Sequence, residues 1–350
     1  MSNVLATWIY LDEKGEETNF PQTSLLSSSK EHQAIYWRCV YVFFKFAQKN
    51  LIGNYDFILF TNYKNTEIIV DNINIIHELK KMNVKIIIRD FTYKLPKNYY
   101  GSWGNQLYEF DILNEFYKLY SPDSKLLMLD SDCLIMQDLS DLFKMLDNSP
   151  AITFWGEDYY NCKDDLIIDG ITERDMTNLT NEYLGTDYKR IHYMNGEFFC
   201  ARYDFIEHIV NEFPEIYNFM VNKFYNNPVP ECVKFNEEAH FLSYFYAKYD
   251  ITTYIREEWI KRMWTADNYY RIVNGDENIP IWHVLCGKKR YNLFIKKIDK
   301  ILSKSDRKII MIMKSILFSM NCKFEEKLLR QEHPLRYIKR KILKFHFLIQ

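Results

Sequence analysis

Two periodicities alternate along the first 130 residues of the chain. Short apolar runs rich in β-branched and aromatic residues predict buried strands, and longer segments with apolar residues at helical spacing predict helices. The predicted strands cover residues 4–10, 55–62, 84–91 and 125–132. The predicted helices cover residues 30–50 and 105–120, with Ser29 as the N-cap of the first. Strands that alternate with helices at this spacing indicate βαβ units and a mostly parallel sheet.

The pattern becomes less regular after residue 150. A helix is expected at residues 237–250, and strands are expected at residues 151–155, 192–206, 251–255 and 279–287. Residues 156–190 are polar and acidic, and they predict a long inserted loop with short helices. Long loops at the catalytic edge of a rigid sheet usually carry function, so we expect this loop to close over a ligand.

The amino-acid composition is that of a folded protein, and its charge is unevenly distributed. Of the 350 residues, 47% are hydrophobic and 17% aromatic, which excludes a disordered chain. The formal net charge is −2, yet the segment from Lys288 onward carries 18 basic and 5 acidic residues, whereas the 287 residues before it carry 27 basic and 42 acidic ones. We expect an acidic domain at residues 1–290 and a basic helical extension at 291–350 that faces an anionic surface.

The cysteines and the terminal segments bear on the compartment. Seven scattered cysteines without a C-x-x-C pair favour reduced thiols over a disulfide framework or a zinc site. The N-terminal segment lacks a basic region and turns acidic by residue 12, unlike a signal peptide. The apolar segment 309–320 is interrupted by Lys314 and is shorter than the about 20 residues that a membrane-spanning helix needs. These features predict a cytoplasmic protein.

Two carboxylates stand one residue apart at the end of the apolar run "KLLML". In a strand, residues i and i+2 point to the same face, so Asp130 and Asp132 are expected to converge while Ser131 turns away. Two converging carboxylates form half of a site for a hard divalent cation, Mg²⁺ or Mn²⁺. Asp and Ser also favour turns, so a plain turn is the alternative. The apolar strand before the pair and the helix start "DLSDLF" after it favour the metal site.

The segment "LLMLDSDCLIMQDLSDLF" resembles the D-x-D segment of nucleotide-sugar glycosyltransferases with the GT-A fold. The nearest resemblance is to glycosyltransferase family 8, the glycogenin-like and lipopolysaccharide galactosyltransferase group. Three later segments follow in the family's order: "YMNGEFF" resembles its F-N-[AS]-G strand, "NEEAHFLSYF" its D-Q-D segment, and "WHVLCGKKR" its H-x-x-G-x-x-K-P-W motif. The resemblance covers residues 1–290 and implies an α/β fold, a Rossmann-like mixed sheet with helices on both faces.

The resemblance also implies an activity and roles for individual residues. It implies metal-dependent transfer of a sugar, with retention, from a nucleotide-diphosphate sugar such as a UDP-sugar to a hydroxyl of a glycan or glycolipid acceptor. Mn²⁺ or Mg²⁺ would be held by Asp130, Asp132 and His283. The donor and acceptor would be bound by Thr7, Tyr10, Asp130, Ser131, Asn195, Gly196, Gly287 and Lys288, with Asn195, Glu237 and Glu238 at the catalytic centre. If Glu238 were a general base, inversion would follow instead.

Each of these residues also has a structural interpretation that the sequence leaves open. His283 is also consistent with an ordinary core histidine, and Asn195 with a turn cap before the following glycine. Glu237 and Glu238 begin a predicted helix, where acidic side chains interact favourably with the helix dipole in any case. Lys288 is also consistent with a solvated basic turn. Thr7 and Tyr10, on the first predicted strand, are equally consistent with core packing.

Three other classes of protein compete with the glycosyltransferase. A haloacid-dehalogenase-type phosphatase would use Asp130 as its nucleophile, but the only D-D pair, Asp164-Asp165, falls in the irregular loop. A nucleotidyltransferase would begin with a glycine-rich basic loop, which the sequence lacks. A non-catalytic carbohydrate-binding protein would explain the 27 Tyr, 25 Phe and 7 Trp but not the carboxylates at the strand end.

The basic extension predicts contact with a membrane surface. Within it, four apolar residues recur near one face of a predicted helix and four basic residues surround them: Leu335, Ile338, Ile342 and Leu343, with Arg336, Lys339, Arg340 and Lys344. Such a helix lies in the headgroup layer of an anionic membrane. The alternative is that it packs on the catalytic domain. Nucleic acid is not expected as a partner, because the acidic domain would repel it.

Overall fold

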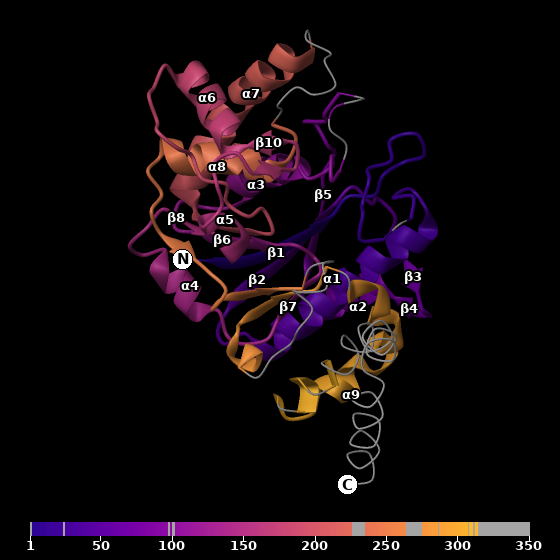
Figure 1. Ribbon diagram of the computed structural model, residues 1–350. Coiled ribbons are helices and arrows are strands. Elements are labelled where there is room, and N and C mark those ends of the chain that lie inside the picture. The colour runs from indigo at the N-terminus through magenta and orange to yellow at the C-terminus, as the bar shows by residue number, and fades with distance from the viewer. Residues whose placement is uncertain are drawn as a thin grey trace, which may run out of the picture.

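A seven-stranded sheet forms the centre of the fold (Figure 1). The computed structural model of the chain describes residues 2–23, 25–96, 99, 102–225, 235–263, 275–285, 287–306, 308–310, 312 and 313. The sheet has the strand order β12-β8-β11-β6-β1-β2-β5. Its strands are β1 (Asn3–Ile9), β2 (Tyr55–Thr61), β5 (Lys85–Ile88), β6 (Lys125–Leu129), β8 (Ala151–Phe154), β11 (Phe198–Arg202) and β12 (Tyr254–Ile255).

The sheet is mixed, with a parallel half and a half that contains antiparallel pairs. β6, β1, β2 and β5 run parallel to one another. β11 runs antiparallel to both β6 and β8, and β12 is parallel to β8. The chain is therefore a mixed α/β protein, as the alternation of strands and helices predicts.

Successive residues of the central strands point into two separate cores. In β6, Leu127 and Leu129 belong to one core and Leu126 and Met128 to the other, as the two-residue period of a strand requires. Helices α3 (Tyr108–Leu119), α7 (Tyr203–Tyr225) and α8 (Glu238–Lys248) cover one face, and α1 (Lys30–Asn50), α2 (Ile75–Lys81) and α9 (Ile298–Leu302) lie on the other side (Figure 1). Helices cover both faces of the sheet, so its central strands β1 and β6 are largely buried on both sides.

Helix α1 begins and ends where the sequence predicts. The Ser29 hydroxyl accepts a hydrogen bond from the His32 backbone N–H at 3.2 Å, which confirms the predicted N-cap. Trp37 and Phe43 of this helix are fully buried. Burial of each such side chain contributes on the order of 1.5–3 kcal/mol, so the apolar face of α1 anchors one side of the sheet.

A second, three-stranded sheet has the order β13-β14-β7 and consists of β13 (Ile260–Arg262), β14 (Ile281–His283) and β7 (Cys133–Ile135). Two short hairpins pair β3 (Ile69–Val70) with β4 (Ile73–Asn74) and β9 (Ile167–Ile168) with β10 (Ile171–Thr172). The remaining helices are α4 (Ser140–Met145), α5 (Glu157–Tyr160), α6 (Glu173–Leu184) and the 3₁₀ helices η1 (Asp276–Asn278), η2 (Gly287–Leu293) and η3 (Ile295–Lys297).

The strand predicted at residues 192–206 is only partly present. Residues 198–202 form β11. Tyr203 begins the 23-residue helix α7, so the predicted strand extends wrongly into the start of this helix. Ile206, Ile209 and Phe213 recur at helical spacing, and all three are buried. The sequence therefore contains the helical period of α7, but the strand pattern directly before it obscured where the helix begins.

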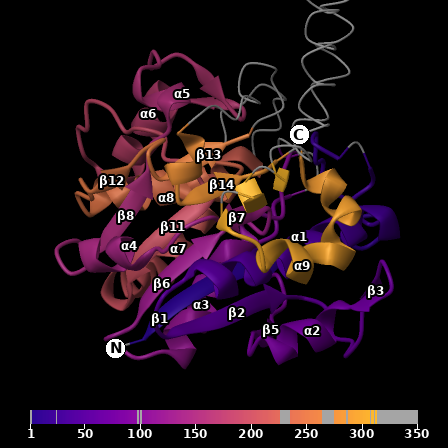
Figure 2. The same ribbon diagram turned by 90° about the horizontal axis from the view of Figure 1, so that it is seen from below.

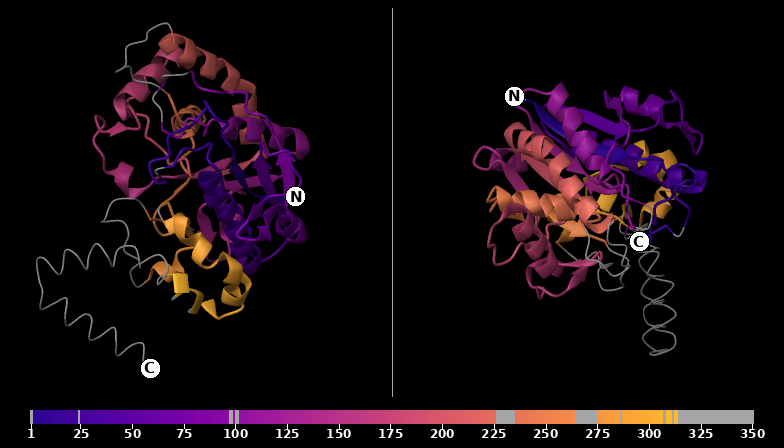
Figure 3. Two further views of the ribbon diagram at one scale, coloured as in Figure 1. Left: turned by 90° about the vertical axis from the view of Figure 1, so that its right-hand side faces the viewer. Right: turned by 90° about the horizontal axis from the view of Figure 1, so that it is seen from above.

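The first part of the basic extension packs on the α/β domain. Tyr291, Phe294 and Ile298 are buried in the same core as α1. Figures 2 and 3 show this yellow segment beside the indigo α1. Two ion pairs of 2.7 Å, Lys45–Asp299 and Lys49–Asp306, join the same helix to the extension.

The segment predicted to bind membranes, residues 335–344, lies outside the described residues. Within the described ranges, none of the helices combines the length and the apolar character needed to cross a bilayer.

Candidate functional site

The order in which the chain adds strands to the central sheet reverses between β1 and β6. From β1 the chain continues to β2 and β5 on one side, and then returns to add β6 on the other side of β1. In open α/β sheets, such a switch point leaves a crevice beyond the carboxyl ends of the two strands, where ligands bind. A cleft with an empty volume of about 950 Å³ that opens to solvent lies there, and Tyr10 after β1 and Asp130 after β6 both line it.

The D-S-D segment is a turn and not the end of a strand. β6 ends at Leu129, and the Asp130 carbonyl accepts a hydrogen bond from the Cys133 N–H at 3.0 Å, which closes a four-residue turn. The predicted strand at 125–132 is therefore too long, and Ser131 lines the cleft instead of turning away from it. The two carboxylates still converge, because the turn carries both toward the same histidine.

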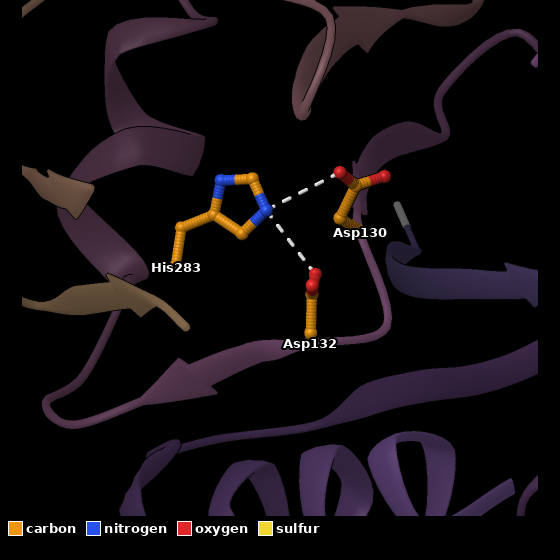
Figure 4. Close-up of side chains that lie close together, drawn as sticks. All are labelled: Asp130, Asp132 and His283. Carbon is orange, nitrogen blue, oxygen red and sulfur yellow. Dashed lines mark ion pairs between the residues drawn. The ribbon is translucent and has the colours of Figure 1, made fainter. Parts of the chain in front are cut away.

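His283 reaches these carboxylates through the three-stranded sheet. In the antiparallel pair of β14 with β7, His283 lies opposite Cys133, and the Val284 N–H donates to the Asp132 carbonyl at 3.1 Å. The imidazole is buried, and its Nε2 lies 3.1 Å from Asp132 Oδ1 and 3.4 Å from Asp130 Oδ2 (Figure 4). One ligand atom of each residue lies within 4.8 Å of the others. Two carboxylate oxygens and one imidazole nitrogen are a donor set that could hold a divalent cation.

Charges around this group compensate one another. Burial alone would raise the pKa of Asp132, but the charges of Lys288 and His283 outweigh it and hold that pKa below its usual range. Burial disfavours the protonated form of His283, yet Asp132 and the neighbouring carboxylates raise its pKa well above the usual value. Burial raises the pKa of Asp130. The group is therefore a tightly coupled set of charges, not a pair of solvated carboxylates.

Lys288 is part of this set. It lies in η2 and is 3% exposed, so the alternative of a solvated basic turn does not hold for it. Its Nζ lies 2.8 Å from Asp132 Oδ2, donates to Tyr36 Oη at 2.9 Å, and lies 4.4 Å from the centre of the Tyr36 ring. Gly287 is buried and is not among the residues that line the cleft.

Glu197 and Arg262 also belong to this cluster of charged side chains, and neither was predicted from the sequence. Glu197 Oε1 lies 3.4 Å from His283 Nδ1 and 2.5 Å from Arg262 Nε. Burial raises the pKa of Glu197, but Arg262 and His283 outweigh it, so the carboxyl remains ionised. Glu197 directly follows Asn195-Gly196, so its place in that motif was an available signal. Arg262 gave no such signal, because its role depends on the pairing of β13 with β14.

Asn195 and Gly196 have different roles. The Asn195 side-chain oxygen accepts a hydrogen bond from the Gly156 N–H at 2.9 Å, and Asn195 is not among the residues that line the cleft. Gly196 does line the cleft, and a Cβ placed on it would lie 1.8 Å from Glu238 Oε1. The glycine therefore allows the Glu238 carboxyl to approach the backbone at this point.

Glu237 and Glu238 both line the cleft at the start of α8. Glu237 accepts a hydrogen bond from Tyr193 Oη at 2.7 Å. Burial, followed by the charge of Asp169, raises the pKa of Glu237 well above its usual range. Asp169 and Tyr193 also line the cleft and were not anticipated from sequence. The loop at 156–190 thus contributes Asp169 and Tyr159 to the cleft wall.

The two residues of the first predicted strand that were proposed for ligand binding, Thr7 and Tyr10, lie in different environments. Thr7 is fully buried within β1, its hydroxyl donates to the Leu129 carbonyl at 2.8 Å, and it is not among the cleft residues. Tyr10 follows the strand and packs edge-on against Phe91 at 5.1 Å between ring centres. Only Tyr10 is therefore placed to touch a ligand in the cleft.

No protein-family model matches the chain, and no curated protein matches it. The chemistry of the site therefore rests on the residues that form it.

Proposed function

We propose that this protein is a metal-dependent glycosyltransferase of the GT-A class that transfers a sugar, with retention, from a nucleotide-diphosphate sugar to a hydroxyl of a glycan or glycolipid. UDP-sugars are the proposed donors. The observation that carries this proposal is the meeting of Asp130, Asp132 and His283 at the switch-point cleft. The cleft combines aromatic side chains with a few charged and polar groups, as sites for small ligands commonly do.

The proposed cation is Mn²⁺ or Mg²⁺, held by Asp130, Asp132 and His283. A divalent cation there would act as a Lewis acid that neutralises the departing diphosphate. Lys288 places a second positive charge beside Asp132, at the carboxyl end of the parallel strands. A diphosphate binds best where several cationic donors converge, so Lys288 is assigned to the diphosphate.

The remaining walls of the cleft fit a base and a sugar. Tyr10, Phe20 and His32 supply rings to the cleft wall, and the His32 ring lies 4.9 Å from that of Phe20. Rings of this kind stack on planar groups such as a nucleotide base. Glu237 and Glu238 supply carboxyl groups to the cleft, and we assign them to hydroxyls of the donor sugar and the acceptor. Asn195 supports this region through Gly156 instead of contacting the ligand.

The test is hydrolysis and transfer by the full chain with a panel of UDP- and GDP-sugars and Mn²⁺, set against hydrolysis of p-nitrophenyl phosphate. Release of the nucleoside diphosphate that requires Mn²⁺ and fails in Asp132→Asn would support the proposal. Asp141→Asn is the matched control, because Asp141 is exposed on α4 and pairs only with Lys144 among the described residues. Phosphate release from p-nitrophenyl phosphate with no turnover of any nucleotide sugar would favour the phosphatase, with Asp130 as its nucleophile.

A further inference from the structure

We propose that Glu197 is a positioning residue that fixes the imidazole of His283 and the turn of Asp130 for cation binding. This inference rests on the metal site of the proposed function, and it adds a residue that contacts two of the three ligands without being one of them.

The first contact is with the histidine ring. Glu197 Oε1 faces Nδ1 of His283 at 3.4 Å, while Nε2 on the other side of the ring faces Asp130 and Asp132. Both side chains are buried. In the neutral ring that a cation requires, a carboxylate at Nδ1 favours the tautomer with the proton on that nitrogen, which leaves the Nε2 lone pair for an ion shared with the two aspartates. The arrangement is the carboxylate–histidine pair that orients imidazole ligands in metal sites.

The second contact is between the Glu197 carboxylate and Arg262. Arg262 Nε lies 2.5 Å from Glu197 Oε1. Arg262 is also the parallel-strand neighbour of His283 in the pairing of β13 with β14. The guanidinium and the imidazole are therefore carried side by side by one small sheet, and Glu197 lies against both. Arg262 and His283 thus approach the same carboxylate oxygen, Oε1 of Glu197.

The third contact reaches the D-S-D turn through the backbone. The Asp130 N–H donates to the Glu197 carbonyl at 3.2 Å, next to the pairing of Phe198 with Leu129 in β11 and β6. A single residue thus holds the turn with its main chain and the histidine with its side chain. Because substitution leaves this main-chain hydrogen bond in place, a variant of Glu197 tests its side-chain contacts with His283 and Arg262 and not its link to the turn.

The chain offers a matched control in Glu173. This buried glutamate also lies between an arginine and a histidine: its Oε2 is 2.6 Å from Arg190 Nε and 3.5 Å from His192 Nδ1. Glu173 is not among the residues that line the cleft. Replacement of either glutamate by alanine removes a buried carboxylate from an arginine, but only Glu197 contacts a proposed metal ligand.

The experiment measures Mn²⁺ affinity on the full-length chain, from the electron paramagnetic resonance signal of free Mn²⁺ during titration. Glu197→Ala should weaken binding about 10–100-fold, the usual effect of removing such a partner. Glu197→Gln, which keeps an acceptor oxygen for Nδ1, should restore most of the affinity. Glu173→Ala should bind Mn²⁺ like the wild type, although its unfolding midpoint in urea should fall.

A double-mutant cycle shows whether Glu197 acts through the histidine. In the His283→Ala background, Glu197→Ala should cause no further loss of Mn²⁺ affinity. An equal loss in both backgrounds would make Glu197 an independent ligand and overturn the positioning role. Wild-type affinity in both Glu197→Ala and Glu197→Gln would also overturn it. If Glu197→Ala does not fold, the Glu197→Gln variant and the same cycle decide the question.

Failure of this inference and failure of the proposed function give different results. If Asp132→Ala loses Mn²⁺ while both Glu197 variants bind it normally, the metal site stands and the positioning role is wrong. If the cycle behaves as expected but no nucleotide sugar is turned over, the positioning role stands and glycosyl transfer is wrong. If the wild type binds no Mn²⁺, both are wrong.

Discussion

The ammonium nitrogen of Lys288 lies 2.8 Å from Oδ2 of Asp132, and both residues are at most 3% exposed. Lys288 comes from the segment that follows β14, whereas Asp132 lies in the turn after β6, so the contact ties the C-terminal part of the cleft to the central sheet. The pair is also adjacent to His283. Stability and ligand binding are therefore coupled at this point of the molecule.

Removal of Asp132 should destabilise the fold as well as disrupt the proposed metal site. Asp132→Ala leaves the buried ammonium of Lys288 without its carboxylate, and such a loss costs about 3–5 kcal/mol. Asp132→Ala combined with Lys288→Met should recover most of this stability, because the second buried charge is also removed. Unfolding in urea measures both effects.

The control for this pair is Asp141→Ala. Asp141 pairs with Lys144 on the surface, where the two side chains are 71% and 70% exposed, so the loss should stay under about 1 kcal/mol. A loss for Asp132→Ala no larger than that for Asp141→Ala would contradict the prediction.

Gly196 should not tolerate even a methyl group. A Cβ at this position would lie 1.8 Å from Glu238 Oε1 and 2.8 Å from its Cδ, so the buried carboxyl must move. Gly196→Ala should lower the free energy of unfolding by about 1–3 kcal/mol, the usual cost of overpacking. Urea unfolding measures this cost, and it should shrink in a Glu238→Ala background, where the clashing group is absent.

Gly104→Ala is the matched control for Gly196. A Cβ on Gly104 would have no atom within 4 Å, so its substitution should leave stability nearly unchanged. Equal effects at the two glycines, or an undiminished cost in the Glu238→Ala background, would show that the contact with Glu238 is not the cause.

The alternation of apolar runs was enough to predict the central elements of the fold. The predicted strands at 4–10 and 55–62 and the helix at 30–50 correspond to β1, β2 and α1, because local periodicity reports burial directly. The prediction failed where the backbone leaves its local pattern. The strand predicted to include Asp132 ends three residues earlier, at Leu129, and a turn follows.

The candidate site was only partly accessible from the sequence. Asp130, Asp132 and His283 were proposed together through the resemblance, and the structure places their ligand atoms within 4.8 Å of one another. The three-stranded sheet that brings them together has β13, β14 and β7 of only three residues each. Strands this short carry no period, so the position of Arg262 beside His283 could not be inferred before the pairing was known.

His240 should make stability depend on pH. It is fully buried on α8, and burial lowers its pKa to about 3. Glu237 Oε1 lies 3.5 Å from His240 Nε2, and His240 Nδ1 accepts a hydrogen bond from the Asn236 N–H at 3.4 Å. The unfolded chain binds the proton near pH 6.5, so the stability that depends on neutral His240 is present above that pH. It is lost as the pH falls toward 3, by up to about 1.4 kcal/mol per unit.

The measurement is the difference in unfolding free energy between the wild type and His240→Gln at pH 7 and at pH 5. The wild type should lose about 2 kcal/mol relative to the variant over this range. His77→Gln serves as the control for loss of an imidazole, because His77 is exposed on α2. A difference between wild type and His240→Gln that is constant with pH would refute the prediction.

The end of the basic extension should bind anionic membranes without contributing to the cleft. The described part of the extension already packs on α1 through Phe294 and Ile298, and the ion pair Lys49–Asp306 adds to this contact. A chain that ends near residue 320 keeps these contacts, so it should fold and bind Mn²⁺ like the full chain.

The same truncation removes the basic and apolar residues between 335 and 344. Each Lys or Arg near an anionic surface contributes about 1 kcal/mol to membrane binding. The full-length chain should therefore sediment with phosphatidylserine vesicles and not with neutral phosphatidylcholine vesicles, and the truncated chain should sediment with neither. Full-length protein with Lys339, Arg340 and Lys344 changed to Gln separates charge from length, and it should behave like the truncated form. Equal binding of the truncated and full-length chains to phosphatidylserine vesicles would assign the end of the extension to packing instead.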